Sequence, residues 1–568
     1  MLDLQATLES RYPDFFARHQ RVGRTLIRSL NRLFRVQRFA DFGQRYPHLQ
    51  GLDFVEQALE YFDFSFKVRD RERARIPASG RVVIVANHPI GSLDGLALLH
   101  LVSSVRTDVK VVANDLLAAI EPLRPLLLPV NNLQGGTPRG QLRRLREHLQ
   151  AEGALIIFPA GEVSRFGPTG IRDGAWQSGF VSLARATRSP VLPVHVGGRN
   201  SLFFYGLSIL ARPLSTLWLV REMFHQRHNA VEVRLGRPVP WEHYSAIEGS
   251  PKHLARLFRR HLYRLPRNAR PVFDSIDTVA APENRILLRR ELALSENLGR
   301  TQDGKSILLV RAGEAPCVMR ELGRLRELTF RTVGEGTGKP RDLDRHDRDY
   351  LQLVLWDDRD LEIVGAYRLG DSAALLQSGG PEALYSHSLF SFGPGMQPLL
   401  AAGLELGRSF VQPRYQNRQA LDYLWQGIGA FLRRYPRFRY LYGPVSISRL
   451  YGEEAIQRIA RYYAGHYRAL PLDVRARNPL PGSKGPCPGE APSEDLAALK
   501  TWLAEQGLAL PTLFKHYAQV AEADGIGVGP FNVDPLFGDC VDALVVVDLT
   551  RLKPAKRRRY LGEATLPD

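Results

Sequence analysis

Short runs of β-branched and other apolar residues alternate with helical patterns along the first half of the chain. The apolar runs cover residues 81–87, 108–113, 154–158 and 191–196. Helical spacing of apolar residues covers 139–152 and 179–187. Strands that alternate with helices are typical of a mostly parallel sheet with helices on its faces. We therefore expect the first half to be an α/β domain.

A second α/β pattern begins at Ser306, with strand-like runs at 361–369, 440–447 and 541–549. The Pro- and Gly-rich stretch 478–494 predicts a loop. A chain of 568 residues has material for more than one domain. We expect a two-domain α/β protein with these parts: a basic amphipathic helical segment at 1–60, a first domain at 61–267, a linker at 268–300 and a second domain at 301–568.

The chain is strongly basic, with 77 Lys and Arg against 59 Asp and Glu and a net charge of +18. This charge favours anionic partners, such as a membrane surface, nucleic acid or an acidic carrier protein. No nucleic-acid readout motif accompanies the charge, so we expect no nucleic-acid partner. The three Cys lie far apart and have neither disulfide nor zinc spacing, which favours a reducing compartment and no metal.

Two segments bear on membrane contact. Within 26–42, apolar residues recur at helical spacing with Arg between them, which is typical either of a basic helix on an anionic bilayer or of a helix packed on the core. The aromatic-rich segment 201–224 indicates an interfacial lid or anchor, or a buried core helix. We find no signal peptide and no spanning segment, and expect a peripheral protein on the cytoplasmic face of the cell membrane.

The run 87–95 reads NHPIGSLDG and stands between a strand and an apolar helix. This places His88 at the carboxyl end of a strand, where open α/β sheets bind ligands. Asp94, near the start of the helix, could reach back to one nitrogen of the ring. A His oriented by an Asp is a general base that can deprotonate a substrate hydroxyl. The alternative is a helix-capping Asp beside a structural His.

A second block, FPAGEVSR at 158–165, also leaves a strand and carries a Gly and an Arg suited to a phosphate. With the run 87–95 and the late segment 190–194, it resembles the lysophospholipid/glycerol-phosphate acyltransferase family over roughly residues 60–265. Two departures, five residues between His88 and Asp94 and a Glu that follows the Gly, resemble the hemolysin-like branch. The resemblance implies catalytic roles for His88 and Asp94 and acceptor binding by Gly161, Glu162 and Arg165, with Arg139 as a further phosphate candidate.

The second half carries a different set of residues between 319 and 410. Their types and order resemble the acyl-carrier-protein-dependent branch of the GNAT N-acyltransferases over roughly residues 305–560. We find no copy of the loop that binds the coenzyme A pyrophosphate, which fits a donor carried on protein-bound phosphopantetheine. The resemblance implies a site made of Arg326, Phe330, Asp344, Asp347, Arg368, Glu405 and Arg408.

The order of the two halves resembles the bifunctional ornithine-lipid synthases. It implies N-acylation of an amino acid by the second domain and O-acylation of the lyso-lipid hydroxyl by the first. The expected donor is acyl-acyl carrier protein or acyl-coenzyme A, and no cofactor is expected to stay bound. The alternatives are a lysophosphatidic-acid acyltransferase with a degenerate second domain, a nucleic-acid-binding protein and a lytic membrane-active protein.

Overall fold

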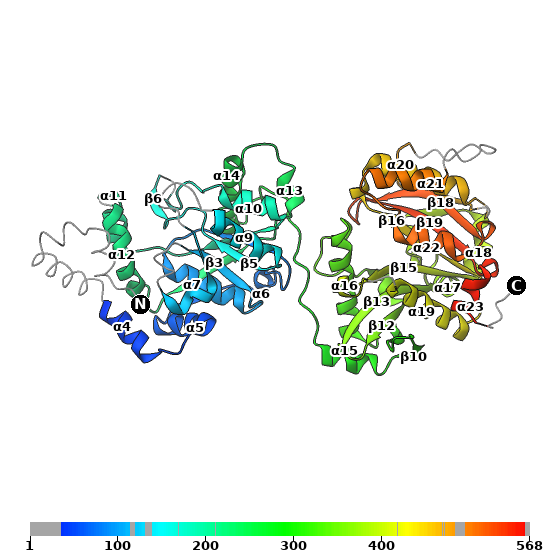
Figure 1. Ribbon diagram of the computed structural model, residues 1–568, viewed down its shortest axis with the longest axis horizontal. Helices are drawn as coiled ribbons and strands as arrows, with labels where there is room; N and C mark the ends of the chain where they lie inside the picture. Colours follow the sequence, from blue (N-terminus) through cyan, green and yellow to red (C-terminus); the bar gives the residue numbers. More distant parts are fainter. Residues whose placement is uncertain are drawn as a thin grey trace, which may run out of the picture. The chain divides into compact units, whose positions relative to one another are not determined.

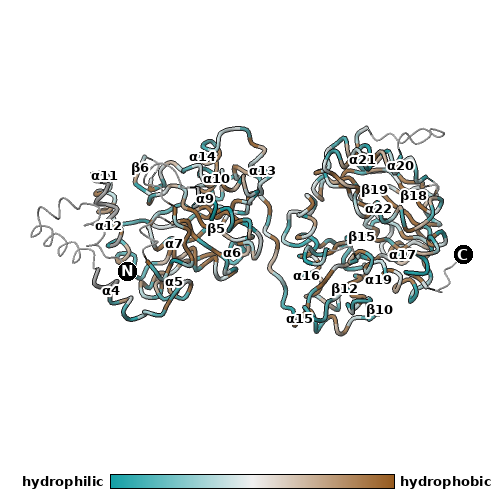
Figure 2. The backbone as a smooth tube through the Cα atoms, viewed as in Figure 1, coloured by the Kyte–Doolittle hydropathy of each residue, from teal (hydrophilic) through white to brown (hydrophobic). Residues whose placement is uncertain are grey.

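The computed structural model describes residues 36–113, 120–130, 139–168, 170–210, 212–416, 419–468, 470, 472–482 and 495–562. The chain divides into two compact units, of which the first ends at Thr278 and the second begins at Val279 (Figure 1). The Thr278 hydroxyl still donates to the Arg75 carbonyl of the first unit, at 2.6 Å. The Ala280 N–H donates to the Pro340 carbonyl of the second unit, at 2.9 Å. Apolar residues concentrate inside each unit separately (Figure 2).

The first unit is built on a seven-stranded sheet whose neighbouring strands are parallel except for one antiparallel pair, β8 and β9. This confirms the α/β prediction, and the four predicted strands are β2, β3, β5 and β8. In spatial order the strands are β1 (Ser65–Lys67), β9 (Ala230–Leu235), β8 (Val191–Val196), β2 (Val82–Ala86), β5 (Ala154–Ile157), β3 (Val109–Ala113) and β4 (Leu127–Pro129).

The central strand β2 is buried on both faces, which explains its unbroken apolar run. Its alternate side chains Val82 and Ile84 pack with helices α5 (Gly51–Tyr61) and α7 (Ser92–Ser103). The other face, with Val83, packs with α9 (Arg139–Gln150), α10 (Gly179–Thr187) and α14 (Pro251–Leu262). The sheet therefore lies between two helical layers, and the strand ends remain at its edges.

The aromatic-rich segment predicted at 201–224 forms two contacting helices, α11 (Leu202–Leu210) and α12 (Arg212–His225). Of the predicted basic helix 26–42, residues up to 35 lie outside the described part, and the remainder falls in α4 (Val36–Arg45). Among the described helices, none is both long and apolar enough to cross a bilayer. The smaller elements of this unit are α6 (Asp70–Arg73), the hairpin β6 (Arg165–Gly167) and β7 (Gly170–Arg172), and α13 (Trp241–Ser245).

The second unit contains an eight-stranded sheet that is antiparallel except between β15 and β16. These two strands pair only over three residues each, Gly403–Glu405 with Tyr440–Tyr442. In order the strands are β10 (Glu296–Arg300), β11 (Ser306–Arg311), β12 (Leu351–Asp357), β13 (Glu362–Asp371), β15 (Gly403–Val411), β16 (Tyr440–Ile447), β19 (Cys540–Asp548) and β18 (Ile526–Asp534). The runs predicted at 361–369, 440–447 and 541–549 correspond to β13, β16 and β19.

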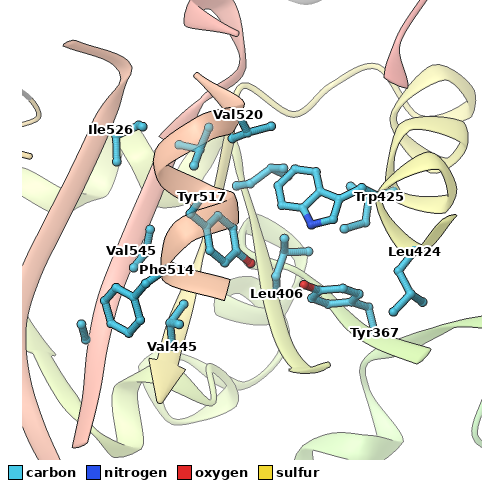
Figure 3. Close-up of a cluster of buried hydrophobic side chains, with 14 of the residues drawn as sticks. Tyr367, Leu406, Leu424, Trp425, Val445, Phe514, Tyr517, Val520, Ile526 and Val545 are labelled. Carbon is cyan, nitrogen blue, oxygen red and sulfur yellow. The ribbon is translucent and has the colours of Figure 1, made fainter. Parts of the chain in front are cut away.

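Helices cover both faces of this sheet. On one face, α19 (Ala420–Arg434), α20 (Glu453–His466) and α22 (Thr512–Val520) enclose a large apolar core. Figure 3 shows Tyr517 of α22 and Trp425 of α19 within it. The opposite face carries α16 (Pro316–Thr332) and a second cluster under α17 (Ser372–Gly379) and α18 (Gln397–Ala401). The remaining elements are α21 (Leu496–Glu505), α23 (Pro554–Tyr560) and the paired strands β14 (Phe390–Phe392) and β17 (Val474–Ala476).

The structure places ordered elements inside the predicted linker at 268–300. Helix α15 (Arg285–Leu292) buries Leu288 and Leu292 against the second unit, because these residues are four apart and share one face. Strand β10 then pairs with β11. The second unit therefore starts earlier than the apolar content of this stretch indicated. Of the predicted loop 478–494, residues 483–494 lie outside the described part.

Candidate active sites

The first site lies where β2 ends. Asp94 is the third residue of α7 and is fully buried, and its Oδ2 accepts the N–H groups of Ile90 at 2.9 Å and Gly91 at 3.1 Å. The same oxygen lies 3.3 Å from Nδ1 of His88, whose side chain keeps 19% of its surface exposed. Because Nδ1 faces the carboxylate, the opposite ring nitrogen is left for a substrate. The Asp caps the helix and orients the His at once.

The loop that carries His88 is held at both ends. The buried side-chain amide of Asn87 exchanges two 2.8 Å hydrogen bonds with the backbone of Val196, which locks the end of β2 to β8. Gly91, the residue before α7, has φ +115°, a conformation that L side chains rarely adopt. The His88 ring packs on Phe158 of the second block, with 4.3 Å between ring centroids. His88 is thus presented on a rigid turn.

Asp173 joins the two sequence blocks and was missed by the sequence analysis. Its Oδ1 accepts the backbone N–H of His88 at 3.1 Å and the Ser164 hydroxyl at 2.6 Å. Its Oδ2 accepts Trp176 Nε1 at 2.9 Å, and burial raises its pKa. The only sequence feature that could have indicated this role is an Asp placed three residues before a Trp in a polar stretch. Asp173 positions His88 through its backbone.

The second block places a charged pair beside the His88 loop. Oε2 of Glu162 lies 3.0 Å from both Nε and Nη2 of Arg165, and Gly161 has φ +67°. The Ser164 N–H donates to the His88 carbonyl at 2.7 Å, which ties this block to the loop that carries His88. Arg139 begins α9, and its side chain lies outside the described part. The structure therefore brings His88, Asp94 and the block 161–165 together.

The second unit gathers its predicted residues on the sheet face under α16. Arg326 donates to Asp347 at 2.8 Å and to Gln352 at 2.6 Å. Arg368, fully buried, donates to both oxygens of Asp344 at 2.8 Å. These guanidiniums lower the pKa of Asp344 and Asp347, against the opposing effect of burial. The charges form one buried network.

Glu405 and Phe330 complete the predicted set at its edges. Glu405 accepts the hydroxyl of Tyr350, whose ring lies 5.1 Å from the Arg368 guanidinium, and the Ser386 N–H at 2.6 Å. The Phe330 ring meets that of Phe537 edge to face at 5.1 Å. Phe537 lies 4.6 Å from the Arg408 guanidinium. All seven predicted residues therefore contribute to one region.

Arg408 reaches this region through a β-bulge. Leu404 and Leu406 of β15 face the core under α19, so regular alternation would send Arg408 the same way. The β13–β15 register shifts at this point and Arg408 takes φ +48°, which turns its side chain to the opposite face. There its Nε lies 3.1 Å from Oδ2 of Asp342, and Nη1 donates to the Tyr385 hydroxyl at 3.2 Å.

Three carboxylates, those of Glu335, Asp534 and Asp542, lie beyond the point where the pairing of β15 and β16 ends. They were not among the predicted residues. Ser446 of β16 donates to Glu335 at 3.1 Å and stands opposite Asp542 of β19. Burial and the neighbouring Asp534 and Glu335 raise the pKa of Asp542 to about 8. Burial raises the pKa of Glu335 to about 7. Groups that titrate near neutral pH can accept a proton from an amine.

The protonation of Asp542 predicts a specific pH dependence of stability. An unfolded Asp titrates near pH 4, so between about pH 4 and 8 the folded chain binds more protons than the unfolded chain. Protonated Asp542 makes its full contribution to the free energy of unfolding below pH 4, and this contribution is lost as pH rises through about 8. The free energy of unfolding of Asp542→Asn, taken relative to that of the wild type, should therefore rise by at least about 1 kcal/mol between pH 5.5 and 8.5. This corresponds to roughly 2–4 °C in relative melting temperature.

Thermal unfolding of both proteins at the two pH values measures this difference. Asp539→Asn is the matched control, because that Asp lies in the turn just before β19 and is exposed. It should change the melting temperature equally at both pH values. A difference between Asp542→Asn and the wild type that does not vary with pH would contradict the assignment.

Comparison with known proteins places both units in acyl transfer. Residues 14–269 match the family model described as acyltransferase, and residues 325–426 match the acetyltransferase (GNAT) domain. A lyso-glycine lipid O-acyltransferase of Bacteroides thetaiotaomicron is 33% identical over 222 residues, covering 38% of this chain and 80% of that protein.

Two of the N-acyltransferases that resemble this chain each match about half of it. The glycine N(alpha)-acyltransferase of Bacteroides thetaiotaomicron is 28% identical over 306 residues, which are 50% of this chain and 90% of that protein. The L-ornithine N(alpha)-acyltransferase of Rhizobium meliloti is 28% identical over 311 residues, which are 52% of this chain and 96% of that protein.

Fold, sites and comparisons together define a two-domain enzyme of O- and N-acyl transfer, with a mixed-sheet acyltransferase domain followed by a GNAT domain. The chain belongs to the acyltransferase family that includes the lyso-glycine lipid O-acyltransferases, and it carries the GNAT domain in the same polypeptide.

Proposed function

We propose that the chain makes a diacylated aminolipid in two steps. The second unit transfers an acyl chain to the amine of an amino acid, and the first unit acylates a hydroxyl of the resulting lyso-lipid. The observation that carries this proposal is the presence in one chain of two units, together with the similarity of the chain to relatives named for these two activities. Because glycine and ornithine have no hydroxyl, the hydroxyl must lie on the first acyl chain.

In the first unit, His88 takes the proton of the acceptor hydroxyl as its oxygen attacks the donor thioester. The ester C–O bond forms, the C–S bond breaks, and the proton passes from His88 to the departing thiolate. Asp94 holds the ring and stabilises the imidazolium. Glu162 and Arg165 bind the polar head of the acceptor.

In the second unit, the acceptor amine loses a proton to a base and attacks the donor thioester. The amide C–N bond forms, the C–S bond breaks, and the departing thiolate takes up the proton. Glu335 and Asp542, whose pKa values are raised to about 7 and about 8, are the candidate proton acceptors in this region. Arg408, which also pairs with Asp342, is the candidate cation for the amino-acid carboxylate.

Beyond their three paired residues each, strands β15 and β16 have no further ladder pairing with each other among the described residues, and their backbone groups there are the candidates to pair with the amides of a phosphopantetheine arm. The donor is acyl-acyl carrier protein, whose acidic surface suits the basic chain.

The alternative of a lysophosphatidic-acid acyltransferase with a degenerate second domain is less well supported. A degenerate domain would not be expected to retain a buried network that pairs Arg326, Arg368 and Arg408 with carboxylates. Membership of the acyltransferase family also disfavours a nucleic-acid-binding or purely lytic protein. A donor carried on acyl carrier protein supports a location of both reactions at the cytoplasmic face of the membrane.

Separating the units tests the proposal. No apolar cluster of the described residues contains members of both units, so residues 1–278 and 279–568 should each fold alone. In a host without aminolipids, the second piece should yield only a mono-acylated, ninhydrin-positive lipid. The first piece should yield none, and should convert added lyso-lipid to the diacylated form.

The second piece is also assayed with acyl-acyl carrier protein and acyl-coenzyme A in competition. The carrier-bound donor should be preferred, and its use should weaken as salt rises, because exposed charges are screened over about 8 Å at physiological ionic strength. Diacylated lipid made by the second piece alone would refute the division of labour. Equal use of both donors at every salt concentration would refute the donor assignment.

A further inference from the structure

Three large apolar side chains lie exposed together beside the first site. Phe166 of β6 is 63% exposed, and Leu202 and Phe203 at the start of α11 are 89% and 59% exposed. Among the described residues of the first unit, the one other exposed large apolar side chain is Leu142, at 37%. We refer to Phe166, Leu202 and Phe203 as the β6–α11 patch.

The patch is held in place by the packing beneath it. Helix α11 contacts both α12 and β6, and its Phe204 and Tyr205 are buried with Val163 in a small separate core. Figure 1 shows α11 and α12 together at one end of this unit. Because α11 buries Phe204 and Tyr205, its Leu202 and Phe203 are exposed on a fixed surface.

A buried carboxylate fixes the start of α11. Glu222 of α12 accepts the N–H of Ser201 at 2.8 Å and its hydroxyl at 2.6 Å, and also Trp218 Nε1 at 3.1 Å. The Phe203 ring lies 4.6 Å from Trp218. The exposed apolar side chains are therefore part of a folded surface and not of a frayed end.

The surroundings of the patch are basic. The Arg221 guanidinium lies 4.7 Å from the Trp218 ring, and Arg199 is exposed immediately before α11. The two acidic residues of these segments are engaged, because Glu222 is buried and Glu162 pairs with Arg165. Aromatic and aliphatic side chains bordered by Arg are typical of surfaces that insert between anionic headgroups.

The patch is continuous with the catalytic loop. Strand β6 begins at Arg165 of the acceptor-binding block, and a side chain at Gly91 would contact Val163 at 3.6 Å and Leu219 of α12 at 3.7 Å. We propose that the β6–α11 patch docks the first unit on an anionic lipid bilayer. The choice of a bilayer rests on the proposed function, because a lyso-lipid acceptor resides in a membrane.

The full chain with Phe166→Ser, Leu202→Ser and Phe203→Ser tests this proposal by sedimentation with vesicles of phosphatidylcholine and phosphatidylglycerol. We expect binding at least tenfold weaker than that of the wild type. The apparent KM for lyso-lipid in vesicles should rise by a similar factor, while turnover of a water-soluble short-chain acceptor is unchanged. Arg199→Gln with Arg221→Gln should remove only the preference for phosphatidylglycerol over pure phosphatidylcholine vesicles.

Leu294→Ser with Leu536→Ser is the matched control, because these side chains of the second unit are 86% and 83% exposed. The control should bind vesicles as the wild type does. The proposal is overturned if the triple variant binds vesicles like the wild type, or if the control loses as much vesicle affinity as the triple variant. It is also overturned if the wild type is a dimer and the triple variant is a monomer. Sedimentation tests vesicle binding independently of acyl transfer. An absence of acyl transfer would contradict the proposed function but not the docking of the patch on a bilayer.

Discussion

His88→Ala is expected to lower O-acylation by about 10²–10⁴-fold, the usual contribution of a positioned general base. The imidazole is the group that the buried Asp94 carboxylate orients at the end of β2, and a methyl group cannot take the proton of the acceptor hydroxyl. N-acylation should continue, because its residues lie wholly in the other unit. The measurement is the ratio of mono-acylated to diacylated lipid with the full-length chain.

Asp94→Asn is the companion variant. The Asn oxygen can still accept the N–H groups of Ile90 and Gly91, so the turn is kept, but the charge that stabilises the imidazolium is lost. O-acylation should fall less than in His88→Ala. Normal ester formation by His88→Ala, or a greater loss in Asp94→Asn, would show that another residue is the base.

Arg368→Met is expected to destabilise the second unit by about 3–5 kcal/mol, the usual cost of removing one partner from a buried ion pair. The guanidinium is fully buried and donates to both oxygens of Asp344, and it lies 3.6 Å from Asp347. Met fills most of the space but leaves the carboxylates without this partner. The thermal transition of residues 279–568 should fall by roughly 10 °C.

Arg345→Met is the control, because Arg345 forms a 3.4 Å ion pair with Glu382 in which both side chains are exposed. Such pairs contribute about 0–1 kcal/mol, so the transition should hardly move. If Arg368→Met has the same melting temperature as the wild type, the ion-pair network does not stabilise the second unit. An equal decrease in melting temperature in both variants would show that the decrease does not depend on the burial of the ion pair.

The residues predicted for the first site lie close together along the chain, and the structure brings them together in space. His88 and Asp94 are six residues apart, and one turn between a strand and a helix brings them to 3.3 Å. Asp173 was missed because it contacts the His88 backbone from 85 residues away. No local pattern distinguishes such an Asp from one that is solvated. The sequence predicts a linker at 268–300 because the two Leu of α15 that are buried have few apolar neighbours in sequence.

By itself the sequence determined the two α/β units, their main strands and the residue types of both candidate sites. Strand and helix periods are local, and they follow from which side chains must be buried. Only the tertiary structure decided how the second site is assembled. A β-bulge turns Arg408 away from the apolar core, and the long-range pairing of β16 with β19 places Ser446 opposite Asp542. Bulges and strand register depend on contacts between distant segments, and the raised pKa of Asp542 depends on the burial that they create.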